Sequence, residues 1–143
     1  MIEKILEILP LLNKNYSNLR GGGCGVFAKA ISEITGYGEF GLLWDNDDPP
    51  GDPPAHVYVK IGDKFLDSKG LHTKEEVLKY YDGNNDDGYL MGECDREEFD
   101  YWYEKLGEGL FTIDYKPQYE EIKNFILENI NRKIKSFEHF IIS

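Results

Sequence analysis

The sequence lacks any long apolar segment and any framework of cysteines. It contains no run of about eighteen apolar residues, so no membrane-spanning helix is predicted. Its start, Met1-Ile2-Glu3-Lys4, has neither the basic end nor the small-residue cleavage site of a secretory signal, and we therefore expect a cytoplasmic protein. The two cysteines, Cys24 and Cys94, fit neither a disulfide framework nor a zinc-motif spacing, so reduced thiols are expected.

Positive charge is also scarce. The chain has 16 Lys and Arg against 27 Asp and Glu, which gives a net charge of −11. Such an acidic chain is unsuited to tracking nucleic-acid phosphates or to binding anionic membrane surfaces. The expected partner is a protein or peptide, and the acidity would favour a basic protein.

What the chain does contain is a composition typical of a packed domain. Hydrophobic residues make up 41% and aromatics 14% of its 143 residues, without internal repeats or linkers. We expect a single α+β domain over residues 1–143, with a small antiparallel sheet. Periodicity and turn signals predict helices near 2–15, 24–35, 73–81, 95–107 and 117–135, a hairpin over 55–68, a strand over 110–115 and a proline-rich surface loop over 45–54.

A glycine run places a thiol at the start of one of these helices. Gly21-Gly22-Gly23 precedes Cys24, and apolar residues then recur at helical spacing until Gly36 stops the pattern. A cysteine in the first helical turn meets free backbone N–H groups and the positive end of the helix dipole. Both favour the thiolate, so we expect Cys24 to have a lowered pKa.

The hairpin supplies candidate partners for this thiol. With Gly62-Asp63 as a two-residue turn, opposed positions sum to 125, so Tyr58 faces Asp67. His56 and Asp67 are then diagonal neighbours on one face, about 7 Å apart, within reach of a hydrogen bond. An imidazole that takes the thiol proton and a carboxylate that orients the imidazole complete the set that a thiol nucleophile needs.

The order Cys24, His56, Asp67 resembles the papain-like superfamily, in which a cysteine at a helix start is followed by a histidine and an Asp or Asn on successive strands. The short gaps look most like its transglutaminase and arylamine N-acetyltransferase branch. The resemblance covers residues 15–70 and implies a papain-like core followed by helical additions over 73–143. It implies that Cys24 is the nucleophile, His56 the base and Asp67 the orienting group of a hydrolase or acyltransferase. No cofactor is expected.

Two positions depart from the papain pattern. Papain-type enzymes have a glutamine six residues before the cysteine that helps to bind the oxyanion, and this chain has Asn18 there. We expect Asn18 and the Cys24 amide to serve in that role. The usual aromatic residue after the nucleophile is replaced by Gly25.

Two metal sites are alternative interpretations. Cys24, His56, Asp67 and Cys94 offer zinc-type ligands, although without paired short spacings. Residues 82–93 resemble a twelve-residue calcium loop, with helices expected on both sides and oxygen ligands at Asp82, Asn84, Asp86 and Glu93. The remaining histidines, His72 and His139, have no obvious partners and are predicted to lie on the surface.

A different class of function also fits the sequence. A compact acidic module, such as an inhibitor, an immunity protein or a phage counter-defence protein, would cover a partner's basic surface without turnover. Selective reactivity of Cys24 separates this class from an enzyme.

Overall fold

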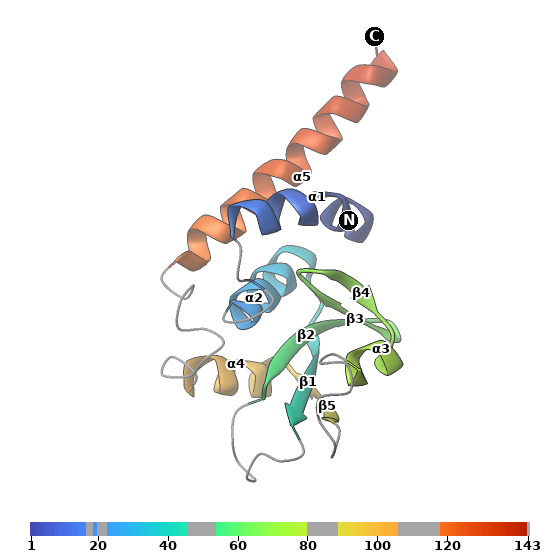
Figure 1. The fold of residues 1–143 in the computed structure, drawn as a ribbon. Coiled ribbons are helices and arrows are strands. Elements are labelled where there is room, and N and C mark those ends of the chain that lie inside the picture. The colour runs from blue at the N-terminus through green and yellow to red at the C-terminus, as the bar shows by residue number, and fades with distance from the viewer. Residues whose placement is uncertain (17–18, 20–22, 46–53, 80–88, 106–117, 143) are drawn as a thin grey trace.

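The computed structural model describes residues 1–16, 19, 23–45, 54–79, 89–105 and 118–142. In these ranges helices and strands are mixed along the chain (Figure 1). The elements are α1 (Ile2–Asn15), α2 (Cys24–Thr35), β1 (Glu39–Asp45), β2 (His56–Ile61), β3 (Lys64–Asp67), β4 (Gly70–His72), α3 (Lys74–Leu78), β5 (Tyr89–Asp95), α4 (Arg96–Lys105) and α5 (Tyr119–Ile142).

The strands form a single antiparallel sheet in the order β4-β3-β2-β1-β5. The α+β fold class with a small antiparallel sheet is therefore confirmed. Because β2 lies at the centre, its residues are covered from both faces, and four of its six residues are buried. The hairpin singled out in the sequence is thus the middle of the sheet.

The two faces of the sheet carry different helices. Phe40 of β1 stacks on Phe99 of α4, with ring centroids 4.1 Å apart, and Val57 and Val59 join α2 in the main core. On the opposite face Val77 of α3 packs with a smaller cluster formed by Leu43, Tyr58 and Phe65. The alternation along β2 therefore directs Val57 towards α2 and Tyr58 towards α3.

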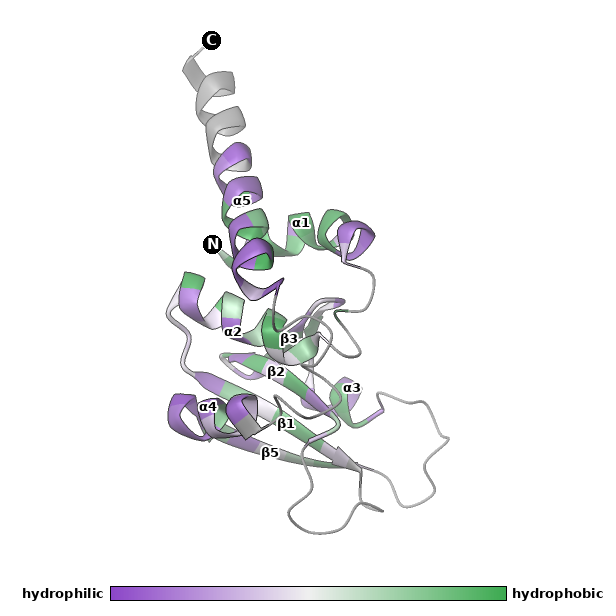
Figure 2. Cartoon of the chain, turned by 90° about the vertical axis from the view of Figure 1, so that its left-hand side faces the viewer, coloured by the Kyte–Doolittle hydropathy of each residue, from purple (hydrophilic) through white to green (hydrophobic). Residues whose placement is uncertain are grey.

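Helices α1 and α5 form an outer layer over α2. Figure 1 shows α5 crossing α1, with α2 between this pair and the sheet. Apolar residues recur along α1 and the central strands, as the hydropathy colouring of Figure 2 shows. Glu33 of α2 joins the layers, because its carboxylate accepts hydrogen bonds from Tyr119 and Lys123 of α5 and from Arg96 of α4.

Several local predictions are confirmed. Helix α2 begins at Cys24 and is followed by Gly36, whose φ of 84° lies in the left-handed region that glycine adopts readily. Helix α3 lies within the predicted 73–81 range and begins with a capping box of Thr73 and Glu76. Helix α5 covers the predicted range from Tyr119 and continues to Ile142.

Strands β4 and β5 are not predicted from the sequence, because their stability comes from pairing. Strand β5 lacks apolar alternation, yet it pairs with β1 along its whole length, from Tyr89 opposite Asp45 to Asp95 opposite Glu39. A single-sequence pattern does not reveal such a non-local partner. The calcium-type loop predicted over 82–93 is therefore wrong at its end, since residues 89–93 belong to this strand, whereas the helix expected after it is present as α4.

Some predictions concern residues that the structure does not describe. The proline-rich loop over 46–53, the strand over 110–115 and the end of the third helix near Tyr81 lie outside the described residues. Among the helices that the structure does describe, none has the length and apolar character needed to cross a bilayer.

A glycine in β1 tests the packing of the α3 face. A Cβ at Gly41 would lie 2.7 Å from Cδ1 of Phe65 and 2.9 Å from Cε of Met91, whereas one at Gly38 would meet nothing within 4 Å. We expect Gly41→Ala to lower the free energy of unfolding by about 1–3 kcal/mol in urea titrations. Gly38→Ala is the control, and equal stabilities of the two variants would contradict this packing.

Candidate functional site

The centre of the candidate site is a buried carboxylate that serves two histidines. Oδ2 of Asp67 lies 3.1 Å from Nε2 of His56, and Oδ1 lies 2.8 Å from Nε2 of His72. The backbone N–H of Lys69 also donates to Oδ1, over 2.9 Å. Asp67 and His56 are each 1% exposed. The predicted contact between His56 and Asp67 is thus present, and it is shielded from water.

The register of the hairpin explains this contact. Ile61 pairs with Lys64 and Val59 with Leu66, so opposed positions sum to 125 as predicted. The side chains of His56 on β2 and Asp67 on β3 both project on the α3 face. Asp67 lies opposite Tyr58, so His56 is its diagonal neighbour, two residues away along β2. The side chain of Tyr58 lies beside them, with its ring 4.6 Å from that of His56 in an edge-to-face arrangement.

The charge of Asp67 fixes the tautomers of its partners. Burial alone would raise the pKa of Asp67, but hydrogen bonds from His56 and His72 outweigh it and hold the pKa well below its usual range. An ionised carboxylate only accepts hydrogen bonds, so both histidines must donate through Nε2–H. A neutral His56 then carries its basic lone pair on Nδ1.

The prediction that His72 is a surface residue without a partner is wrong. His72 lies in β4, which pairs with β3 so that Asp67 faces Gly70 and Phe65 faces His72. Its side chain is 21% exposed and reaches Asp67 from the strand on the other side. The signal in the sequence was the short Ser68-Lys69 turn before Gly70, which returns the chain along β3 and brings His72 to the same face.

Cys24 lies at the N-terminus of α2, as predicted, and its sulfur meets strand β2. The backbone N–H of Val57 lies beside the sulfur and favours the thiolate, as do the N–H groups of Gly25 and of Cys24 itself. Val57 lies beyond the paired part of β2 and β3, which reaches only to Val59. The cysteine sulfur therefore lies beside the β2 backbone, one residue from His56.

The expected lowering of the Cys24 pKa is wrong for this conformation. Cys24 is 1% exposed, and burial raises the pKa of its thiol to about 12 despite the opposing N–H groups. The negative charge of Asp67 raises this pKa further. At neutral pH the thiol is protonated, so any reaction of Cys24 needs a base to remove the proton.

The sulfur and the histidine approach β2 from different directions. His56 lies on the α3 face beside Tyr58, whereas Val57 packs with Cys24 in the core on the α2 side. The effect of the Asp67 charge on the thiol shows that it lies within electrostatic range of the His56–Asp67 pair.

A buried hydroxyl, that of Ser68, directly follows Asp67 in the chain. Ser68 is buried, and its Oγ has no hydrogen-bond partner among the residues that the structure describes. Its carbonyl oxygen accepts a hydrogen bond of 2.7 Å from Asn13 of α1, which holds the turn in place. Asn18, the predicted oxyanion residue, lies outside the described residues.

The metal alternatives receive no support from the described residues. These include Cys24, His56, Asp67 and Cys94, and no group of three or more His, Cys, Asp or Glu side chains among them could hold a metal ion. Of the calcium-type ligands, Asp82, Asn84 and Asp86 lie outside the described residues. Glu93 lies on β5, where its carboxylate pairs with the Lys60 ammonium at 3.2 Å.

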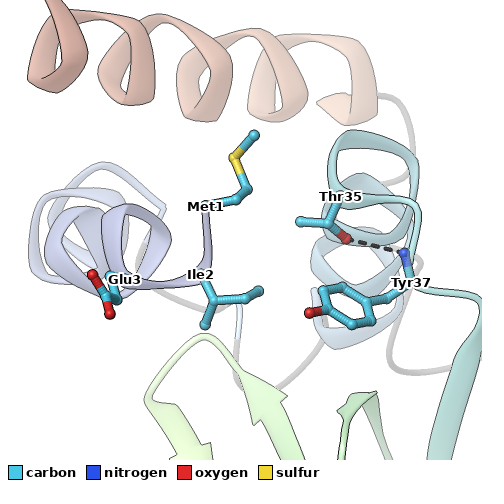
Figure 3. Close-up of a pocket in the computed structure, with 5 residues that line it drawn as sticks. All are labelled: Met1, Ile2, Glu3, Thr35 and Tyr37. Atoms are coloured by element: carbon cyan, nitrogen blue, oxygen red, sulfur yellow. Dashed lines mark hydrogen bonds between the residues drawn. The ribbon is translucent and has the colours of Figure 1, made fainter.

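A surface pocket on the described residues is remote from this chemistry. A pocket of about 490 Å³ is lined by Met1, Ile2, Glu3, Thr35 and Tyr37 (Figure 3). It lies at the C-terminal end of α2, whereas Cys24 begins that helix about 16 Å away at 1.5 Å per residue. Its polar features, such as the 3.3 Å hydrogen bond from the Tyr37 N–H to Thr35 Oγ1, suggest no reaction.

Replacing the shared carboxylate should change the dependence of stability on pH. Because folding lowers the Asp67 pKa, its ionisation stabilises the fold above about pH 4, the unfolded pKa, and this stabilisation is lost as the pH falls. We expect Asp67→Asn to lower the free energy of unfolding by roughly 1.5–3 kcal/mol at pH 7, and by less at pH 3.

Urea titrations at the two pH values measure this difference. Asp63→Asn is the matched control, since Asp63 is an exposed carboxylate in the turn of the same hairpin. A loss of stability in Asp67→Asn that is the same at pH 7 and pH 3 would contradict the ionised, doubly bonded carboxylate.

Comparison with known proteins finds no match: no family model fits the chain, and no curated protein or solved structure is significantly similar to it. The resemblance to the papain-like superfamily therefore depends on Cys24, His56 and Asp67 in this chain alone.

Proposed function

We propose that the protein is a thiol-dependent hydrolase or acyltransferase that acts on an amide, isopeptide or ester bond. The observation that supports this function best is the buried hydrogen bond of 3.1 Å between His56 Nε2 and Asp67 Oδ2. It leaves Nδ1 of His56 as the basic nitrogen, next in the chain to the Val57 N–H that contacts the Cys24 sulfur. The three residue types match the roles of nucleophile, base and orienting group.

The first step forms a thioester. The Cys24 sulfur attacks the carbonyl carbon of the substrate while Nδ1 of His56 takes the thiol proton. The resulting imidazolium stays bonded to Asp67, whose negative charge compensates it. His56 then gives this proton to the departing amine or alcohol, and the acyl group remains on the sulfur.

The second step releases the acyl group. Water or an amine attacks the thioester and loses a proton to His56, which returns it to the Cys24 sulfur. In both steps negative charge develops on the carbonyl oxygen. The N–H groups of the first turn of α2 are the donors at hand for this oxyanion, since a helix leaves its first amides without intrahelical partners. The buried Ser68 hydroxyl and the predicted Asn18 are further candidates.

This mechanism uses His56 as a general base rather than a preformed thiolate and imidazolium. With a pKa raised to about 12, the Cys24 thiol keeps its proton until an electrophile arrives. Since Cys24 is 1% exposed, the contacts over it must open transiently before a substrate or a small electrophile can react. A protein or peptide segment is the expected substrate, because its binding can supply the free energy for this opening.

A non-catalytic binding module is the second candidate, and the burial of Cys24 favours it. A protonated, covered thiol is inert, and the net charge of −11 would then attract a basic protein. Binding by such a module would weaken with added salt and would be unaffected by Cys24→Ser.

Alkylation by iodoacetamide separates the two candidates. Cys94 is an internal reference, because it is 9% exposed and its pKa is also raised to about 12 by burial. We expect Cys24 to react faster than Cys94 at pH 7, and His56→Gln to slow Cys24 by about 100-fold without changing Cys94. Peptide mass spectrometry measures both rates in one sample.

We choose glutamine at position 56 because its amide can still donate a hydrogen bond to Asp67 but cannot act as a base. Circular dichroism spectra and urea titrations establish that the variant is folded. Equal, slow alkylation of the two cysteines that His56→Gln leaves unchanged would contradict the enzyme and favour the binding module.

A further inference from the structure

We propose that His72 is a positioning residue of the Cys24 site, which holds Asp67 so that the carboxylate fixes the tautomer of His56. This inference rests on the proposed function, to which it adds a fourth residue. Its basis is that the Asp67 carboxylate binds two imidazoles, one through each of its oxygens. Oδ1 accepts from His72 Nε2 at 2.8 Å, and Oδ2 accepts from His56 Nε2 at 3.1 Å.

The two histidines occupy corresponding places on the strands that flank β3. His56 comes from β2 and His72 from β4, and each lies diagonally to Asp67 on the α3 face. The ring of Tyr58 meets both imidazoles edge-on, with centroid distances of 4.6 Å to His56 and 6.1 Å to His72. The carboxylate is thus held from both sides and cannot rotate without breaking a hydrogen bond.

Without His72 the carboxylate would lose a partner that the rest of the hairpin does not replace. Lys69 N–H also binds Oδ1 at 2.9 Å, but it belongs to the turn and lies only two residues from Asp67. Within the part of the chain that the structure describes, the hydrogen bond from His72 ties Oδ1 to a separate strand. Loss of this donor would let the carboxylate turn, and the Nε2–H tautomer of His56 would lose its preference.

The role of His72 differs from that of His56. His56 is 1% exposed, whereas the His72 side chain is 21% exposed and lies at the border between the site and solvent. Glu76 of α3 lies on that outer side, where its charge interacts with His72. His72 contacts the site through its hydrogen bond with Asp67, so its role is to position Asp67 and, through it, His56.

Two readouts test the inference, and the first needs no reactive cysteine. Long-range ¹H–¹⁵N correlation spectra report the tautomer of each of the 3 histidines over the pH range in which the rings are neutral. His56 is assigned by the loss of its signals in His56→Gln. We expect His56 to be the Nε2–H tautomer in the wild type, a mixture in His72→Ala, and again Nε2–H in His72→Gln, whose amide can donate to Oδ1.

The second readout is the alkylation rate of Cys24. We expect His72→Ala to slow it roughly tenfold and His72→Gln to restore it, with Cys94 as the internal reference. His139→Gln is the control for loss of a histidine elsewhere, on α5. If His72→Ala does not fold, His72→Met fills the same space without donating a hydrogen bond.

An unchanged His56 tautomer in a folded His72→Ala or His72→Met protein would overturn the inference, whatever the alkylation rate. A changed tautomer that glutamine restores would support it. If the wild-type Cys24 shows no reactivity that depends on His56, the proposed function fails, while the tautomer still decides whether His72 positions the pair.

Discussion

The site depends on one buried negative charge. Asp67 is 1% exposed, and a lone carboxylate at such a position would be unfavourable. Two imidazoles and a backbone N–H offset this cost, and the imidazoles lower the pKa of Asp67 although burial acts in the opposite direction. The ionised state then determines which nitrogen of each histidine carries a proton. Strand register, side-chain orientation and the chemistry of His56 are linked through this carboxylate.

The fold also brings the N-terminus of helix α2 to the backbone of strand β2, one residue from His56. Helix α2 packs on the sheet through the core that contains Val57, and its first residue, Cys24, reaches the β2 backbone where β3 is no longer paired. The same burial that positions the sulfur raises its pKa to about 12. A site of this kind is protected while empty and needs the base at the moment of reaction, which is why His56 carries more of the proposed chemistry than the helix dipole does.

Local signals in the sequence predicted the central part of this arrangement. The Gly62-Asp63 turn fixed the register of β2 and β3, and with it the contact between His56 and Asp67. The spacing after Cys24 and the glycine at 36 gave the bounds of α2. His72 was missed because β4 has three residues and no apolar alternation, and β5 because its stability depends on β1. The predicted lowering of the Cys24 pKa is wrong because burial raises this pKa by more than the N–H groups at the helix start lower it. Burial is a property of the packed molecule and cannot be read from the helix signal alone.

Trapping an acyl group on the Cys24 sulfur would show directly whether this thiol is a nucleophile. p-Nitrophenyl acetate can transfer its acetyl group to a thiol and release p-nitrophenolate, and peptide mass spectrometry locates the acetyl group. We expect transient acetylation of Cys24, little acetylation of Cys94, and loss of the Cys24 adduct in His56→Gln. Absence of acetyl from Cys24 in the wild type, or equal acetylation in His56→Gln, would contradict the account.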